Sequence, residues 1–566
     1  MNAHISRSYC ALLFAIGISF FTIILVKLFW IQIINHSFYL TCAERQYFFT
    51  LTAYPPRAPI FDRTGTNYLA LNKESLAAFI IPTEIEDRAA LESFLKRHFP
   101  SAYERLHPSS SLQKKFLYVA RRLTPEQKKL IEDAQLTDIH FLQEPSRFYP
   151  IPSAGAIVGI TDIDNNGLFG IEKKCDAQLK GTPHTIRIEK DARSGHYIRV
   201  ETLDAGISGK PVQLTIDATL QFLAHEAVAQ TVAKFGAKQG AAIIMDPVTG
   251  EILAMVNVPS FDPNHLAKLD LAHTKVTALT DTFELGSVFK VFSALAALAE
   301  GVVTPDELID CKNTKTTFID GRKINTVLPH GIIPFKDVIA FSNNIGIAIV
   351  AKRVGDKIYS HYTQLGFGTS TGIELMGEAP GFVNPPHNWS KQSIISLSYG
   401  YEVTATLMQL ACAFALIARD GVPVHPHILS PVTQPSAAAL SGLRRDSYAE
   451  ASSHRRATKP LYEAETIAII KELLRRTSQY GTAKKAQVHG CTVMSKTGTA
   501  NMLIDGVYVD TKNRYTCAGI VQKGDYQRVI VTFVQEAARG DLFAATVTAP
   551  LFEEIAERML IHEKMI

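Results

Sequence analysis

The chain has 566 residues, of which 46% are hydrophobic and 20% are charged. A chain of this length is too long to fold around one hydrophobic core, so several domains are expected. The formal net charge of +4 is small for such a length and gives no indication of nucleic-acid binding. The seven cysteines are scattered, without a C-x-x-C pair or a Cys/His cluster, so neither zinc binding nor a disulfide framework is indicated.

An apolar segment lies near the N-terminus. From Tyr9 to Val26 no residue is charged, and this run approaches the thickness of a bilayer core at about 1.5 Å per residue. Lys27 and Trp30 suit the membrane interface that follows. The run is longer than a typical signal-peptide core and no small-residue cleavage site follows closely. A transmembrane anchor at 9–35 is therefore favoured over a cleaved signal peptide or a buried helix.

The charges and the turn-rich segments predict the orientation and the domain boundaries. Arg7 in a head without acidic residues predicts a cytoplasmic segment at 1–8, with the remainder extracytoplasmic. The glycine-rich stretch from Asp204 to Pro211 is typical of a hinge. It separates a predicted first region, 36–210, from a second region, 211–566.

Several elements are predicted in chain order. Residues 60–65 indicate a strand running into a turn, and Thr124-Pro125-Glu126-Gln127 indicates a helix start. In the second region, the hydrophobic pattern predicts a strand at 212–216, a helix at 218–235 and a hairpin of 241–245 with 252–256. A helical section follows Ser287, and the region ends with strands at 516–521 and 528–535 and a terminal helix from about Ala549 to His562. Residues 430–460 predict an exposed insertion. Helices packed on an antiparallel sheet are the simplest architecture.

Three short strings occur in a meaningful order: Ser287-Val288-Phe289-Lys290, then Ser342-Asn343-Asn344, then Lys496-Thr497-Gly498-Thr499. The S-x-x-K pattern recurs at Ser93 and Ser111, so it is weak alone, whereas S-x-N and K-T-G each occur once. The ordered set is the signature of β-lactamases and penicillin-binding proteins. It predicts serine acyl chemistry.

The first string suits nucleophilic catalysis. In a helix, Ser287 and Lys290 share a face, so the amine can reach the hydroxyl. The apolar residues around Lys290 predict burial, which should lower its pKa toward that of a usable base. The N–H of Ser287, at a helix start, is a candidate oxyanion donor. Alternatively, Lys290 extends to solvent or pairs with an acid.

The second and third strings supply further polar groups. A hydroxyl at Ser342 can relay a proton, and the Asn344 amide can orient the lysine and the substrate, although both residue types also favour helix N-caps. On a strand, Lys496, Thr497 and Thr499 can bind a terminal carboxylate, and Gly498 leaves room for a peptide alongside. The Thr499 N–H is a second candidate oxyanion donor. Alternatively, Lys496 protects an edge strand.

The chain resembles class B (monofunctional) penicillin-binding proteins over nearly its whole length. Segments similar to the family's other boxes are Arg57 to Ala70, Arg147 to Pro150, Gly167 to Glu172, Asp246 to Met255 and Thr371 to Leu375. Ala58 replaces a usual glycine, which puts the local turn in doubt. Tyr399 to Thr404 is more similar to division-type members. The segment at Thr406 lacks the usual proline, and Ser495 stands where Gly or Ala is commoner; neither change should abolish catalysis.

The resemblance implies an α+β multidomain protein. It would have an N-terminal transmembrane helix, a mixed α/β pedestal similar to a dimerisation domain, and a penicillin-binding/β-lactamase-like transpeptidase domain. Ser287 would be the acyl-ester nucleophile and Lys290 its base. Ser342 and Asn344 would form the second motif, and Lys496 to Thr499 the third.

In function, the resemblance implies a peptidoglycan D,D-transpeptidase of septal cell-wall synthesis that is inhibited by β-lactams and needs no metal or cofactor. It would be a single-pass protein of the bacterial inner membrane with a periplasmic catalytic domain. A separate glycan polymerase and other division proteins would be its partners. A β-lactam sensor or a slow scaffold of the division complex is the alternative. A bifunctional enzyme lacks support, because no H-x-G follows the E-D pair at Glu132-Asp133. A β-lactamase would usually be about half this length.

Overall fold

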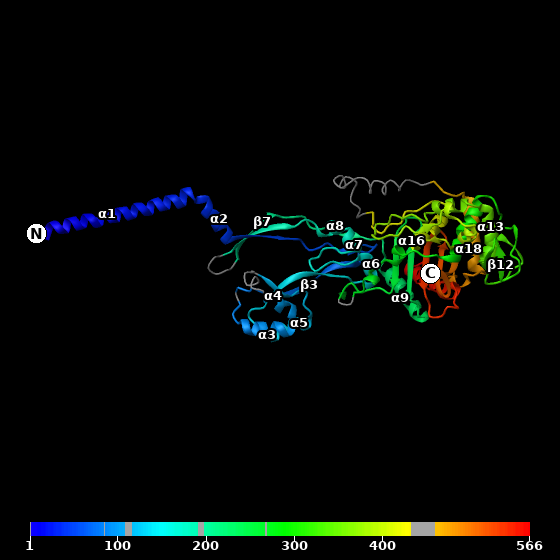
Figure 1. The fold of residues 1–566 in the computed structure, drawn as a ribbon, viewed down its shortest axis with the longest axis horizontal. Helices are drawn as coiled ribbons and strands as arrows, with labels where there is room; N and C mark the ends of the chain where they lie inside the picture. Colours follow the sequence, from blue (N-terminus) through cyan, green and yellow to red (C-terminus); the bar gives the residue numbers. More distant parts are fainter. Residues whose placement is uncertain (1, 84, 108–115, 191–196, 267–268, 432–458) are drawn as a thin grey trace. The chain divides into compact units, whose positions relative to one another are not determined.

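The structure is a computed structural model that describes residues 2–566 except 84, 108–115, 191–196, 267–268 and 432–458. The predicted insertion at 430–460 falls almost entirely outside the described residues. By internal contacts the chain divides into two compact units (Figure 1). One comprises Met1–Arg57 with Lys180–Gly209, and the other comprises Ala58–Leu179 with Lys210–Ile566.

The first unit begins with a long apolar helix. Helix α1 (Asn2–Phe29) continues through a π-helical turn (Trp30–Ile34) to α2 (His36–Tyr47). The span from Ser8 to Ile34 has 27 residues and a mean hydropathy of 2.5, which is enough to cross a membrane by length and composition. This agrees with the predicted anchor. Strands β1 (Phe48–Ala53), β6 (His184–Lys190) and β7 (Tyr197–Asp204) form a three-stranded antiparallel sheet.

The second unit contains the rest of the predicted pedestal. Its sheet comprises β2 (Ile60–Phe61), β3 (Tyr68–Ile80), β4 (Leu117–Ala120), β5 (His140–Phe148) and β8 (Val212–Gln213). Its helices are α3 (Arg88–His98), α4 (Pro100–Leu106), α5 (Pro125–Asp133), α6 (Gly155–Val158), α7 (Gly170–Lys174) and α8 (Asp176–Lys180). The predicted start of α5 is confirmed, because Thr124 and Gln127 form a reciprocal capping box.

Two sequence features of the pedestal are explained by the structure. Ala58 does not have a positive φ, and its N–H donates to Leu179 O at 2.8 Å, so the glycine usual at this position is not needed. Arg147 Nε donates to Glu172 Oε1 at 2.7 Å, and both side chains are almost completely buried. This buried pair ties β5 to α7.

A five-stranded antiparallel sheet forms the centre of the C-terminal part. Its strand order is β10-β9-β19-β18-β17, with β17 at one edge. The strands are β9 (Gln239–Met245), β10 (Ile252–Val258), β17 (Thr492–Ile504), β18 (Val507–Lys523) and β19 (Tyr526–Gln535). The predicted hairpin and C-terminal strand pair are confirmed. The predicted strand at 212–216 is shorter, because only Val212–Gln213 pairs with β2.

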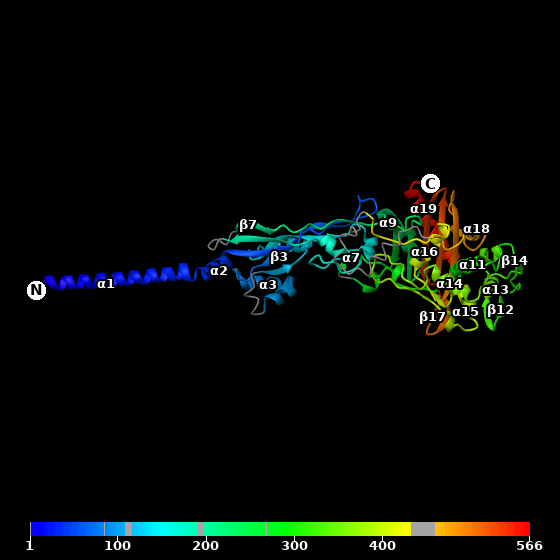
Figure 2. The same cartoon turned by 90° about the horizontal axis from the view of Figure 1, so that it is seen from above.

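Helices cover both faces of this sheet (Figure 2). On one face lie α9 (Ala218–Phe235) and α19 (Ala544–His562). The other face packs against α11 (Lys290–Ala299), α16 (Leu407–Ala418) and α18 (Ala464–Gln479). Neighbouring sheet residues such as Ile243 and Ile244 enter different cores, as strand alternation requires. The predicted α+β architecture is confirmed.

Shorter elements complete this part. The helices are α10 (Thr277–Thr280), α12 (Phe335–Ala340), α13 (Asn344–Val354), α14 (Lys357–Gln364) and α15 (Ser393–Ser398). Small strand pairs are β11 (Leu308–Asp310) with β14 (Ile332–Pro334), β12 (Thr316–Ile319) with β13 (Arg322–Asn325), and β15 (Phe382–Val383) with β16 (Val403–Thr404).

Two local details differ from simple sequence rules. Helix α19 begins at Ala544, five residues before the predicted start, and contains Pro550. Its first turns are buried against the sheet at Ala544 and Val547, and this packing outweighs the low helix propensity of proline. Helix α16 starts in the segment that lacks the usual proline, and there Thr406 forms a capping box with Gln409, which supplies the helix start in another way.

Candidate active site

Ser287 lies in a 3-10 turn, Gly286–Phe289, that leads into α11. The N–H of Lys290 donates to the carbonyl oxygens of Ser287 and Val288, so the serine opens the helix as predicted. Helix α11 is almost entirely buried, and the Lys290 side chain is fully buried. The alternative that Lys290 extends to solvent is therefore wrong.

Lys290 contacts the second string. Its Nζ donates to the carbonyl oxygen of Ser342 at 2.5 Å, to the Ser342 hydroxyl at 3.0 Å and to the amide oxygen of Asn344. Within the described ranges, no hydrogen bond joins Lys290 to the Ser287 hydroxyl. Ser287 itself is partly exposed. The amine is thus oriented by the Ser342 loop.

The middle residue of the second string has a structural role. Asn343 Oδ1 accepts from the N–H groups of Ile345 and Gly346, both at 2.9 Å, and so caps α13. The cap that was considered for Ser342 and Asn344 is therefore formed by the residue between them. Ser342, with φ +56°, and Asn344 flank the cap and contact Lys290 from either side of it.

The third string lies on the edge strand β17. Lys496 Nζ donates to the Ser342 hydroxyl and to the Thr497 carbonyl oxygen, both at 2.9 Å. Its side chain is fully buried, so it is not the solvated lysine that protects an edge strand. The three strings, more than 200 residues apart at their ends, therefore converge on the hydroxyl of Ser342.

Close backbone packing places Ser287 beside β17. A Cβ on Gly498 would lie 2.4 Å from Leu285 O and 2.7 Å from Val288 Cγ2. A Cβ on Gly286, where φ is +59°, would lie 2.8 Å from Thr499 O. The missing side chain at Gly498 therefore serves the junction between the turn and the strand.

A second glycine contact comes from the 399–402 loop. A Cβ on Gly400, where φ is +87°, would lie 2.2 Å from Gly286 O. Glu284 also accepts a hydrogen bond from the Glu402 N–H at 3.0 Å. This loop therefore lies directly against the segment that carries Ser287. The sequence indicated this loop only through its resemblance to division-type proteins.

Helix α18 covers part of the free edge of β17. Ser478 Oγ accepts from Ser495 N at 3.0 Å and lies 2.9 Å from Ser495 Oγ, and the Thr477 hydroxyl donates to Ser495 O. Ser495 thus has its own hydroxyl partner, which explains how the chain tolerates serine where a smaller residue is usual. Because alternate residues expose their backbone groups to the same edge, the N–H groups of Thr497 and Thr499 also face that edge.

The threonine hydroxyls have partners in the structure. Thr497 Oγ1 donates to Thr482 Oγ1 at 3.0 Å, and Thr499 Oγ1 accepts from Ala544 N at 3.0 Å at the start of α19. Of the other S-x-x-K copies, Ser93 lies within α3, and Ser111 lies outside the described residues. Sequence reasoning missed Thr482, which no local pattern distinguishes.

The electrostatics of the site follow from burial. Desolvation, together with the nearby charge of Lys496, holds the pKa of Lys290 well below its ordinary value. Desolvation also lowers the pKa of Lys496, to about 7. Two ammonium groups on one hydroxyl repel each other, so one amine is favoured in its uncharged form. An uncharged lysine beside a serine is a candidate general base.

The fold and this site define a class of protein. A helix-flanked antiparallel sheet with Ser-x-x-Lys, Ser-x-Asn and Lys-Thr-Gly assembled at its edge is the arrangement of serine enzymes that react with β-lactams. The penicillin-binding protein transpeptidase domain family matches residues 240–557, which is more than half of the chain. The penicillin-binding protein dimerisation domain family matches residues 52–214. The chain belongs to the penicillin-binding protein family.

The curated relatives of the chain support the same family. The chain is 29% identical to the probable peptidoglycan D,D-transpeptidase PbpC of Pseudomonas aeruginosa, covering 94% of this chain and 90% of that protein. It is 30% identical to penicillin-binding protein PbpB of Mycolicibacterium smegmatis (79% and 69% covered) and 27% identical to the peptidoglycan D,D-transpeptidase FtsI of Escherichia coli (93% and 87%). These are class B relatives of the FtsI type, as expected.

A solved structure has the same fold. Penicillin-binding protein 3 of Mycobacterium tuberculosis, complexed with aztreonam, superposes with a TM-score of 0.65 at 25% identity. The match covers 91% of this chain and 97% of that one. Together with the N-terminal apolar helix, the FtsI-type relatives indicate a membrane-anchored protein.

Proposed function

We propose that this protein is a serine D,D-transpeptidase that cross-links peptidoglycan stem peptides in septal cell-wall synthesis and is acylated by β-lactams. The observation that carries the proposal is the shared hydroxyl of Ser342, which receives hydrogen bonds from Lys290 and Lys496 beside the Ser287 turn. The family and the names of the FtsI relatives support the same activity.

In the first half-reaction, Ser287 Oγ attacks the carbonyl carbon of the penultimate D-alanine of one stem peptide. The uncharged amine of Lys290 takes the hydroxyl proton. The N–H groups of Ser287 and Thr499 stabilise the oxyanion. The peptide bond then breaks as Ser342 passes its proton to the leaving amine of the terminal D-alanine and takes the proton that Lys290 had removed from Ser287, so that the Lys290 amine is uncharged again. An acyl ester on Ser287 remains, with the Asn344 amide orienting the lysine and the peptide.

In the second half-reaction, an amine of another stem peptide attacks the ester carbonyl. Its proton returns to the serine oxygen through the same base, so that the new peptide bond forms and Ser287 is regenerated. Lys496, as an ammonium, and Thr497 bind the carboxylate of the terminal D-alanine. Gly498 and Thr499 hold the edge of β17 against the Ser287 turn, where an extended peptide can add as a strand.

Location, domains and partners are part of the proposal. The cytoplasmic head is 1–8, the anchor is 9–35, the pedestal is 36–210 and the transpeptidase domain is 211–566. The last two lie in the periplasm of a bacterium, with the anchor in the inner membrane. The partners are a separate glycan polymerase and other division proteins. The FtsI names of the relatives and the long N-terminal apolar helix support this arrangement.

A stem-peptide assay tests the activity. The purified full-length protein in detergent is incubated with a D-Ala-D-Ala stem peptide and an acceptor peptide, and cross-linked dimers are measured by mass spectrometry. Wild type is expected to form dimers and Ser287→Ala none. Fluorescent penicillin labelling without dimers would favour a β-lactam sensor. A Ser287→Ala protein that still supports division in cells would favour the scaffold.

A further inference from the structure

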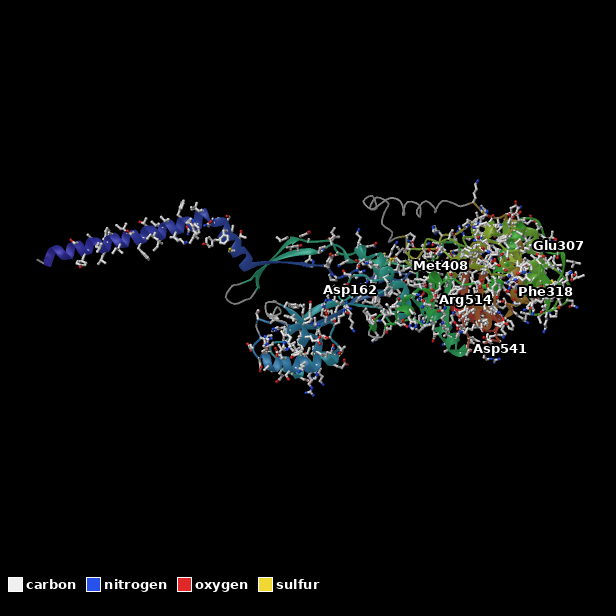
Figure 3. The ribbon with its side chains drawn as sticks, viewed as in Figure 1. Asp162, Glu307, Phe318, Met408, Arg514 and Asp541 are labelled. Atoms are coloured by element: carbon white, nitrogen blue, oxygen red, sulfur yellow. The ribbon has the colours of Figure 1, made fainter. Side chains whose placement is uncertain are left out.

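The β12–β13 hairpin borders the second motif. Asn344 Nδ2 donates to the carbonyl oxygen of Asn325, at the end of β13, at 2.5 Å. Arg322 is the first residue of the same strand. Figure 3 labels Phe318, on the partner strand β12, at the outer margin of this part of the protein. The hairpin therefore connects the protein surface with a residue that contacts Lys290.

Arg322 lies partly buried among polar and aromatic groups. Its guanidinium donates to the hydroxyl of Ser396, which is fully buried in α15, and lies 5.9 Å from the ring centroid of Tyr399. In the part of the chain that the structure describes, no carboxylate lies within 4 Å of it. A partly desolvated cation without a paired anion favours binding of an anionic group.

Arg322 stands next to a group of three tyrosines. The ring centroids of Tyr399 and Tyr401 are 5.8 Å apart, and those of Tyr401 and Tyr508 are 4.9 Å apart. The same loop carries Gly400, which packs against Gly286 beside the proposed nucleophile. Tyr399 and Tyr401 therefore lie on the loop that packs against the Ser287 turn, with Arg322 of β13 next to Tyr399, whereas Lys496 and Thr497 lie on β17.

Two acidic residues, Glu402 and Glu284, belong to the same region. Glu402 Oε2 accepts from Asn384 Nδ2 at 2.8 Å, and Glu284 accepts from the Tyr508 hydroxyl at 3.0 Å. Arg514, labelled in Figure 3, acts electrostatically on Glu284. Arg322, 5.9 Å from the Tyr399 ring centroid, and Glu402 both act electrostatically on Tyr399, so a cation and an anion near the same ring suit a ligand group that carries both a carboxylate and an ammonium.

We propose that Arg322 binds a carboxylate on the side chain of the stem peptide's diamino acid, with Glu402 facing the adjacent ammonium. The preferred substrate is then a peptide with a diamino diacid at that position, whose side chain ends in an amino acid group. This rests on the proposed function, because the Ser287 turn must receive the stem peptide. The carboxylate of the terminal D-alanine is a different group, and in the proposed function Lys496 and Thr497 bind it.

Three synthetic pentapeptides test the proposal. They carry at the third position meso-diaminopimelate, its side-chain carboxamide, or lysine, and so differ in a single carboxylate. KM for release of terminal D-alanine is measured with full-length protein in detergent. Wild type is expected to show a KM at least about tenfold lower for the free carboxylate than for the carboxamide. The KM ratio is independent of the fraction of active protein.

Two substitutions of Arg322 and one control give the decisive comparison. Arg322→Gln is expected to bring the KM ratio to about one, and Arg322→Lys to retain part of it, because lysine keeps the charge but loses the planar fork. Lys323→Gln, on the exposed neighbour in β13, should leave the ratio unchanged. A wild type with equal KM values, or an Arg322→Gln protein that keeps the ratio, would overturn the proposal. Failure of the proposed function looks different: wild type would then consume none of the peptides, and this inference would lose its basis too.

Discussion

Lys290 and Lys496 lie on opposite sides of one hydroxyl, since both side-chain amines donate to Ser342 Oγ, at 3.0 and 2.9 Å. Both side chains are fully buried, and burial lowers both pKa values. The protein therefore keeps two buried amines near one hydroxyl, where desolvation favours their uncharged forms. In the proposed mechanism, Lys290 is the base and Lys496 is the cation that binds a carboxylate.

The rate of acylation should have a bell-shaped dependence on pH. It should rise with pH while Lys290 loses its proton, because only the uncharged amine is a base. It should fall through about pH 7 as Lys496 loses the charge that binds a carboxylate. The second-order rate constant of penicillin acylation, measured from pH 5 to pH 10, checks this. A methyl ester of the same penicillin should lack the falling limb, and a falling limb common to both compounds would contradict the assignment.

Lys290→Arg should abolish most acylation. A guanidinium keeps its proton at any accessible pH, so the substitution preserves the charge but removes the base. We expect a loss of at least about 100-fold in the rate of penicillin labelling. Lys323→Arg, on the exposed face of β13, is the matched control and should label at the wild-type rate. Near-normal labelling of Lys290→Arg would mean that another group takes the proton.

Gly400→Ala should damage both stability and acylation. The new Cβ would lie 2.2 Å from Gly286 O and would push the 399–402 loop away from the Ser287 turn. Gly355→Ala is the control, because Gly355 also has a positive φ, +67°, but has no neighbour within 4 Å of a Cβ. Denaturant unfolding should show a loss of about 1 kcal/mol for Gly355→Ala and about 3 kcal/mol or more for Gly400→Ala. Equal losses would contradict the importance of this contact.

The buried Arg147–Glu172 pair should be essential to the pedestal. Arg147→Met leaves a buried carboxylate without this partner and should cost about 3–5 kcal/mol of unfolding free energy. The double variant Arg147→Met with Glu172→Leu should lose less, because neither charge remains buried. The exposed pair of Arg539 and Asp541 offers the contrast, and Arg539→Met should leave the free energy of unfolding almost unchanged.

The elements that the sequence predicted well have local causes. The helix at 218–235 and the hairpin of 241–245 with 252–256 follow from hydrophobic periodicity and a turn at Asp246 to Gly250, and the structure reproduces them. The order of the three strings predicted which residues meet, although the expectation rested on resemblance as well as on spacing.

Other features have non-local causes. The contact of Gly400 with Gly286 joins residues 114 positions apart, and Asn344 reaches Asn325 through a fold that no local pattern specifies. The early start of α19 depends on burial against the sheet rather than on propensity. The sequence does not distinguish the capping residue Asn343 from Ser342 and Asn344, because the difference depends on which of them contact Lys290.

The central claim is that the hydroxyl of Ser287, beside the convergence of the three strings, is the nucleophile. The most direct measurement is peptide mapping of the protein after reaction with penicillin, by mass spectrometry of the modified peptide. The account predicts one penicilloyl group, on Ser287, and none in the Ser287→Ala protein. A penicilloyl group on Ser93 or Ser111 instead, or undiminished labelling of Ser287→Ala, would contradict it.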